Sequence, residues 1–260
     1  GFTPYQCYSF FMKILTSVLL FHIICMTGLK SFAQTQPHKV RIGAYFGLNL
    51  DVYKVNDAGG WLDNSALGFV SGGMEVDFEY TDRYSIGGGL YFKPYAEGVE
   101  FKNMLSSSFS NSMSTLQFPV YLRARTYFQN KDAVAYILGG AALAINQSFD
   151  SYSFETGTYT NASGENIGYS AAVNTHLKRV FPLIFMGGGL DTRIFNQERH
   201  PYSKDLRIAL SVRRYFGFTD VMKLDIDYIL NNSGAAFFAQ ENYKGGYWMF
   251  SIFLIYAFER

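Results

Sequence analysis

The chain has 260 residues, of which 48% are hydrophobic and 18% aromatic, and its formal net charge is +1. A net charge this close to zero excludes a general polyanion-binding surface as the organising feature, and the sequence carries no signature of nucleic-acid recognition. Because only 6 residues are proline and no Ser/Gly/Pro-rich linker interrupts the sequence, we expect one domain behind the N-terminal segment.

The N-terminal segment has the layout of an export signal. A Met-Lys pair at 12–13 is followed by an apolar stretch at 14–29 and by the small-residue sequence SFA before Gln34. The apolar stretch is shorter than the ~20 residues of a membrane-spanning helix, which favours a cleavable signal peptide over an anchor. The predicted division is an upstream extension that need not be translated (1–11), a signal peptide (12–33) and the exported domain (34–260).

The exported domain alternates apolar and mostly polar residues over long stretches. In residues 40–53, every second residue from Val40 to Val52 is apolar, whereas Arg41 and Asn49 occupy alternate positions. Period-two alternation of this length predicts a β-strand with one apolar and one polar face. Eight such strands are predicted, at residues 40–53, 69–80, 84–95, 116–128, 133–146, 182–195, 206–217 and 247–258.

The connections between these strands differ in length in a regular way. Long connections at 54–66, 96–114, 147–180 and 217–245 are interspersed with shorter ones at 81–83, 129–132 and 196–205. Transmembrane barrels carry long extracellular loops at one end and short periplasmic turns at the other, and ~9–11 residues of tilted strand cross a bilayer. The predicted fold is therefore all-β, an eight-stranded antiparallel up-and-down transmembrane β-barrel of a Gram-negative outer membrane, preceded by a cleavable signal peptide.

The apolar face of each strand is expected to point to lipid and the polar face to the lumen. In a bilayer, only a closed barrel pairs all strand backbone groups. The alternative fold is a secreted soluble barrel or sandwich that buries its apolar rows, as a lipocalin-like calyx does. The aromatic content and the unequal connections favour the membrane barrel.

The polar faces carry charges of nearly balanced sign. Side chains can fill the interior of an eight-stranded barrel, and buried charge is costly unless it is paired. We therefore predict a closed lumen with a structural network of ion pairs, formed by Arg41, Glu75, Asp77, Glu79, Arg123, Arg125, Asp191, Arg193, Arg207 and Arg213. Asp51, Lys93 and Glu97 belong to the same inward-facing set, and the expected strand register places Arg41 opposite Glu79.

Other sequence features were candidates for chemistry. The ladder of Glu75, Asp77 and Glu79 could bind a cation or supply paired catalytic carboxylates, but arginines are expected at the same depth. The glycine clusters lack the Lys and Ser/Thr of a phosphate-binding loop and lie within strands. Metal-ligand spacing is absent, and no catalytic, cofactor or metal site is predicted. The one candidate for lipid-modifying chemistry is His176 with a nearby serine in loop 147–180.

The exported region resembles the PorT-like outer-membrane β-barrels, a family of small Gram-negative barrels. The resemblance rests on the stretches LQFPVYLRARTYF, AYILGGAAL and MGGGLDTRI and on a last strand ending in IYAF. It implies an outer-membrane barrel and, through the founding member of the family, a link to protein secretion across that membrane. No functional residues are carried over from it.

The predicted function is that of a monomeric, non-enzymatic barrel with a closed lumen that acts through its extracellular loops or its partners. An accessory role in protein secretion is one form of this function. The expected partners are outer-membrane lipid and, through loops 147–180 and 217–245, envelope proteins or extracellular ligands, with no nucleic acid. The alternatives are a surface adhesion or binding barrel and a lipid-modifying enzyme.

Overall fold

The computed structural model describes residues 39–51, 54–64, 68–101, 108–128, 133–160, 163–194, 206–231 and 234–259. All regular elements within these ranges are β-strands. None of the described residues forms a helix long and apolar enough to cross a membrane. The predicted upstream extension and signal peptide, residues 1–33, lie outside the described residues.

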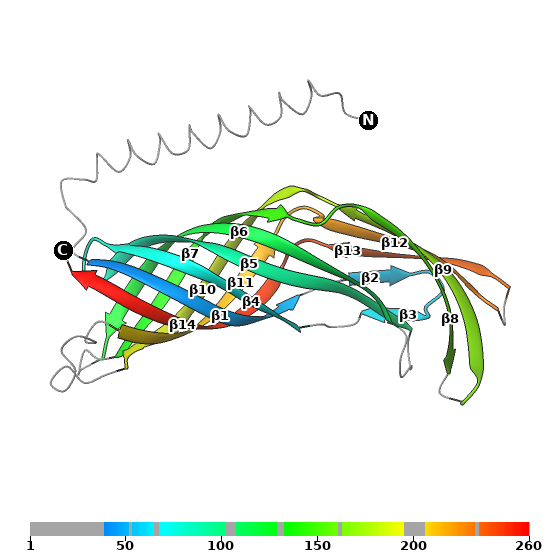
Figure 1. Ribbon diagram of the computed structural model, residues 1–260, viewed down its shortest axis with the longest axis horizontal. Coiled ribbons are helices and arrows are strands. Elements are labelled where there is room, and N and C mark those ends of the chain that lie inside the picture. Colours follow the sequence, from blue (N-terminus) through cyan, green and yellow to red (C-terminus); the bar gives the residue numbers. More distant parts are fainter. Residues whose placement is uncertain are drawn as a thin grey trace, which may run out of the picture.

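Eight antiparallel strands close into a barrel, which confirms the predicted fold (Figure 1). Around the barrel, the order is β1–β4–β5–β6–β7–β10–β11–β14, and pairing of β14 with β1 completes the circle. The barrel strands are β1 (Lys39–Asp51), β4 (Gly68–Glu79), β5 (Tyr84–Phe101), β6 (Ser108–Tyr127), β7 (Ala133–Asn146), β10 (Val180–Arg193), β11 (Leu206–Gly217) and β14 (Tyr247–Glu259).

Alternation along these strands separates an outer apolar face from an inner face of charged, polar and aromatic side chains. Leu122 on β6 is 67% exposed and faces outward, whereas Tyr121 and Arg123 on either side of it are buried. Outward-facing aromatic side chains, including Tyr84 and Tyr256, lie at the short-turn end of the barrel. This arrangement suits a barrel in lipid, where an apolar outer band is flanked by interfacial aromatic residues.

The prediction that 147–180 and 217–245 are loops is wrong, because both segments fold into hairpins. The first contains β8 (Ser151–Thr160) and β9 (Asn166–Leu177), and the second contains β12 (Met222–Leu230) and β13 (Ala236–Tyr243). With β2 (Lys54–Asp57), they form a five-stranded sheet in the order β2–β13–β12–β9–β8. We call it the extracellular sheet. It extends the molecule beyond the end of the barrel that has the long connections (Figure 1). At this end, β3 (Leu62–Asn64) pairs with β5.

The alternation of apolar and polar residues is weaker in β9 than in the barrel strands, because the outward face of β9 has few large apolar side chains. On β9, Ile167, Tyr169 and Val173 are buried, but the alternate positions hold small or polar residues such as Ser170 and Asn174. A strand in water needs no large apolar side chains on its exposed face, so half of the signal of a lipid-spanning strand is lacking. The inner face still packs into an apolar cluster that includes Leu62, Val173, Leu224, Ile226, Tyr228 and Ala239.

The barrel and the extracellular sheet meet along a row of short connections. These connections are residues 147–150 (β7 to β8), 178–179 (β9 to β10), 218–221 (β11 to β12) and 244–246 (β13 to β14). Backbone hydrogen bonds join neighbouring connections: Asn146 N donates to Arg179 O at 2.9 Å, and Lys178 N donates to Val221 O at 2.7 Å. In turn, Val221 N donates to Tyr243 O at 2.8 Å. The strand breaks therefore lie side by side, and we call this level the junction row.

Candidate functional site

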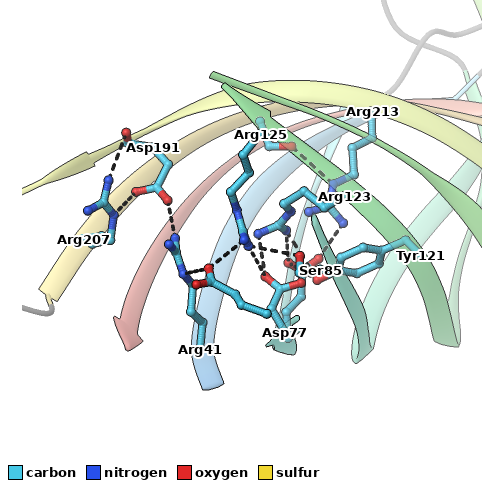
Figure 2. A network of polar contacts seen from close by, with 12 residues as sticks. Arg41, Asp77, Ser85, Tyr121, Arg123, Arg125, Asp191, Arg207 and Arg213 are labelled. Carbon is cyan, nitrogen blue, oxygen red and sulfur yellow. Dashed lines mark hydrogen bonds and ion pairs between the residues drawn. The ribbon is translucent and has the colours of Figure 1, made fainter. Parts of the chain in front are cut away.

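Charged side chains from facing strands meet inside the barrel near its short-turn end (Figure 2). Arg41 Nε contacts Glu79, and Arg41 Nη1 lies 2.7 Å from Asp191 Oδ2. Arg207 Nε lies 2.5 Å from Asp191 Oδ1, and Arg125 Nη1 lies 2.6 Å from Glu79 Oε1. Each of these two carboxylates therefore binds two arginines, with Arg41 shared between them, which offsets the desolvation of the two acids and three arginines.

Glu75 is the centre of a second group of ion pairs deeper in the lumen. Arg213 Nη1 lies 2.5 Å from Glu75 Oε1, and Arg123 Nη2 lies 3.2 Å from Glu75 Oε2. The Tyr91 hydroxyl donates to Glu75, and Arg123 Nη1 lies 2.5 Å from Asp77 Oδ2. The three carboxylates of β4, Glu75, Asp77 and Glu79, are therefore paired with arginines rather than arranged around a metal ion.

The structure brings nine of the ten predicted lumen residues together in these two groups. Arg41, Glu75, Asp77, Glu79, Arg123, Arg125, Asp191, Arg207 and Arg213 are buried, and Arg193 is half-buried. Of the further inward-facing residues, Asp51 and Lys93 pair with each other, whereas the side chain of Glu97 lies outside the described part of the molecule. Buried charges of opposite sign are therefore matched at two depths.

The predicted register of β1 and β4 is wrong by two residues. Arg41 lies opposite Asp77, and Lys39 lies opposite Glu79. The expected ion pair of Arg41 with Glu79 nevertheless forms, because a long arginine side chain reaches its diagonal neighbour on the adjacent strand.

Aromatic rings fill the lumen beyond the charged groups. Tyr215 stacks between Phe185 and Tyr247, with ring centroids 4.8 Å and 4.3 Å apart. The Tyr247 hydroxyl donates to Gln117 Oε1 at 2.6 Å, joining β14 to β6 on the opposite side of the barrel. Rings of this size in a narrow barrel leave little free cross-section.

Glycines in the strands make room for the aromatic rings. A Cβ atom at Gly87 would overlap both the Tyr121 ring and the Asp77 carboxylate. The glycine clusters in the barrel strands therefore include positions where a side chain would displace the lumen contents.

A further polar contact lies in the lumen toward the extracellular sheet. Lys93 Nζ on β5 lies 2.6 Å from Asp51 Oδ1 on β1, and the Tyr243 hydroxyl on β13 donates to the same oxygen at 2.5 Å. Lys93 Nζ also lies 4.5 Å from the centroid of the Tyr247 ring, a cation–π distance. The part played by Tyr243 was missed from sequence, because this residue lies in a segment expected to be a loop.

Glu241 is an isolated acid on the inner face of the extracellular sheet. It is fully buried, and neither of its carboxylate oxygens has a hydrogen-bond partner among the described residues. Its neighbours in the sheet register are Leu224 and Val55. Burial without a partner raises the pKa of Glu241 to about 8. No sequence signal distinguished it, since its strand was not predicted.

His176 lies on the outer face of β9 and is 59% exposed. Its Nδ1 is 3.9 Å from Asp150 Oδ2, and its Nε2 is 4.0 Å from Asp225 Oδ2. Burial alone would raise the pKa of Asp225, but hydrogen bonds from Lys223 and Gln240 and the Lys223 charge lower it. No serine hydroxyl is hydrogen-bonded to His176 in the described ranges, which also contain no group of three or more His, Cys, Asp or Glu arranged for a metal.

The chain is similar in structure to several small outer-membrane proteins. Against OprG of Pseudomonas aeruginosa the TM-score is 0.48 at 10% identity, covering 86% of this chain and 98% of OprG. Against Ail of Yersinia pestis in complex with a heparin analogue, the TM-score is 0.37 at 11% identity, covering 84% of this chain and 99% of Ail. Against the protease OmpT of Escherichia coli, the TM-score is 0.40 at 9% identity, covering 85% of this chain and 97% of OmpT.

The sequence comparisons identify the family of the chain but no individual relative. No curated protein matches it significantly. The family model described as "Outer membrane protein beta-barrel domain" matches residues 32–223, which is most of the chain and includes seven of the eight barrel strands. This match and the closed barrel locate the protein in the outer membrane of a Gram-negative bacterium. The chain belongs to the outer membrane protein β-barrel domain family.

Proposed function

We propose that this chain is a non-enzymatic binding protein of the outer membrane, in which a closed barrel anchors the extracellular sheet as a contact surface for a partner protein. The observation that carries the proposal is the position of β8. This strand is at the edge of the extracellular sheet and pairs only with β9 within the described residues. An open strand edge can accept an extended segment of another protein as an additional strand.

Exposed aromatic side chains near this edge support the same role. Phe149, Tyr152 and Phe154 are 74%, 66% and 63% exposed, and they lie beyond the barrel rather than on its lipid-facing band. Aromatic side chains are enriched at protein interfaces, where they supply contact area that is costly to leave in water. The edge backbone and these rings together fit an extended partner segment with apolar side chains.

The contents of the barrel favour anchoring over transport. The lumen is crossed between facing strands by Arg41–Asp191, Arg213–Glu75 and Tyr247–Gln117. Because the two ion pairs and the Tyr247–Gln117 hydrogen bond are buried, a permeating solute would have to break them. The resemblance to PorT-like barrels makes an envelope protein of a secretion system one class of partner, and an extracellular ligand of an adhesion barrel is the other.

Site-specific photocrosslinking in living cells tests the proposal. A photoreactive amino acid at Tyr152 or Phe154 should give a discrete crosslinked product, whereas the same group at Phe238, exposed on β13 of the same sheet, should not. The identity of the product separates an envelope partner from an extracellular one. If the barrel is correctly inserted and neither Tyr152 nor Phe154 gives a crosslinked product, the proposal is contradicted.

The non-enzymatic part of the proposal has its own test. The exposed His176, flanked by carboxylates near 4 Å, is the residue on which lipid modification would depend. Purified barrel should not turn over radiolabelled outer-membrane lipid. Turnover that is lost in His176→Ala would replace the proposed function with that of a lipid-modifying enzyme.

A further inference from the structure

An outward-facing arginine lies at the edge of the lipid-facing band that is nearer to the extracellular sheet. Arg214 on β11 is opposite Trp248 on β14, which in turn is opposite Leu50 on β1. Its guanidinium carbon is 5.3 Å from the Trp248 ring centroid and 5.4 Å from that of Phe216. Trp and Tyr are typical of the membrane–water boundary, so this row marks the level at which the apolar band meets the headgroups.

More basic side chains follow along the adjacent junction row. Lys178 and Arg179 lie between β9 and β10, Lys244 lies between β13 and β14, and all three are exposed. The guanidinium of Arg214 belongs to the same level, because a Cβ atom added to Gly246 in that row would lie 3.7 Å from Arg214 Nη2. We call Lys178, Arg179, Arg214 and Lys244 the basic belt.

The belt cations have no carboxylate partners in the described part of the chain. Lys178 Nζ donates to Thr219 Oγ1 at 3.2 Å, and Arg179 lies over the Phe149 ring. Nη1 of Arg214 is buried and has no hydrogen-bond partner among the residues that the structure describes. Asp150 and Asp220 are the acidic residues of the junction row, so cations outnumber acids at this level. By contrast, the arginines of the two ion-pair groups in the lumen are paired with carboxylates.

We propose that the basic belt binds the phosphate groups of lipid headgroups in the outer leaflet. Arginine and lysine form charge-assisted hydrogen bonds with phosphate, and arginine does so through a planar fork that also stacks on aromatic rings. The belt continues directly from the lipid-facing band, so a lipid whose acyl chains lie along β11 and β14 presents its headgroup at Arg214. The occupant that fits is a phosphorylated, lipid A-type glycolipid, which carries anionic groups at this depth.

Native mass spectrometry of the purified full-length barrel tests this proposal. The probes are lipid A carrying both phosphates, the same lipid A after enzymatic removal of its phosphates, and inorganic phosphate as a soluble competitor. Each Lys or Arg near an anionic membrane surface contributes about fivefold in binding. The triple variant Lys178→Gln/Arg179→Gln/Arg214→Gln should therefore bind the phosphorylated lipid about a hundredfold less well than the wild-type protein.

The controls separate the belt from general charge and from misfolding. Arg83→Gln removes an exposed cation in the turn between β4 and β5, at the other end of the barrel, and should leave lipid binding unchanged. Arg214→Lys keeps the charge and should retain most of the binding. Heat-modifiable migration in electrophoresis reports whether each variant forms a barrel.

The proposal is supported if a folded triple variant loses its preference for phosphorylated over phosphate-free lipid A while Arg83→Gln keeps it. Equal binding of the two lipids by the wild-type protein would overturn it, and so would a triple variant with undiminished preference. Displacement of the lipid by millimolar inorganic phosphate would also contradict it, because the belt would then be a site for a free anion.

Discussion

Arg213 on β11 and Glu75 on β4 form a buried ion pair across the lumen, with Nη1 2.5 Å from Oε1. The two strands are not neighbours in the barrel, and their residues are 138 positions apart in the chain. The pair therefore holds distant parts of the wall at a fixed separation. Because neither charge can reach water, Arg213 depends on Glu75 for compensation, whereas Glu75 is also paired with Arg123.

Removing one partner of this pair should destabilise the barrel more than removing both. Glu75→Gln leaves Arg213 buried without its counter-charge and should lower the free energy of unfolding by about 3–5 kcal/mol. The double variant Glu75→Gln/Arg213→Gln should recover part of this loss. Urea titration of the protein refolded into lipid vesicles measures both values.

The matched control for this cycle is Asp227→Asn, which neutralises an exposed acid on β12 and should have little effect. A double variant whose loss equals the sum of the two single losses would show that the charges do not depend on each other.

The outward face of β6 should be sensitive to charge because it contacts lipid. Leu122→Arg should cost about 2–4 kcal/mol if the residue lies near the middle of the bilayer, whereas Leu122→Met, which remains apolar, should be nearly neutral. The same vesicle titration applies. Equal behaviour of the two variants, or a wild-type protein that stays soluble without detergent, would contradict the assignment of this face to lipid.

Glu241 should make the stability of the protein depend on pH. Its pKa is raised from an ordinary value of 4.5 to about 8, so between these values the folded state binds more protons than the unfolded state. The free energy of unfolding should therefore fall as pH rises from about 4.5 to about 8. Glu241→Gln removes this contribution, and the variant should gain stability relative to wild type as pH increases.

Thermal unfolding in detergent at a series of pH values checks this prediction, with Asp227→Asn as a control for the loss of an exposed acid. If Glu241→Gln and the wild-type protein show parallel pH profiles, Glu241 has a partner that lowers its pKa in solution.

The barrel could be predicted from sequence because lipid imposes a strong pattern on each spanning strand. Residues 40–53 alternate throughout because one face must be apolar for lipid, while Arg41 and Asp51 face a polar lumen. The composition of the lumen followed from charge balance on the inward positions. The exact register did not, since a shift of two residues in pairing β1 with β4 keeps every side chain on the same face.

The extracellular sheet could not be predicted in the same way, since its strands face water and an apolar layer of modest size. The residues that depend on that sheet, Tyr243 against Asp51 and the isolated Glu241, were therefore missed. The basic belt was also not visible, because Lys178, Arg214 and Lys244 come together only when the four strand breaks align.

A closed barrel that serves as an anchor should not conduct ions, and this can be measured as conductance in planar bilayers. Wild-type protein at neutral pH, with insertion verified by protease protection and a general porin as positive control, should show no steady conductance. The reason is that ion pairs and stacked rings cross the lumen from Arg41–Asp191 to Lys93–Asp51. Large and stable single-channel steps from the pure wild-type protein would show that the lumen is open and would make transport its primary function.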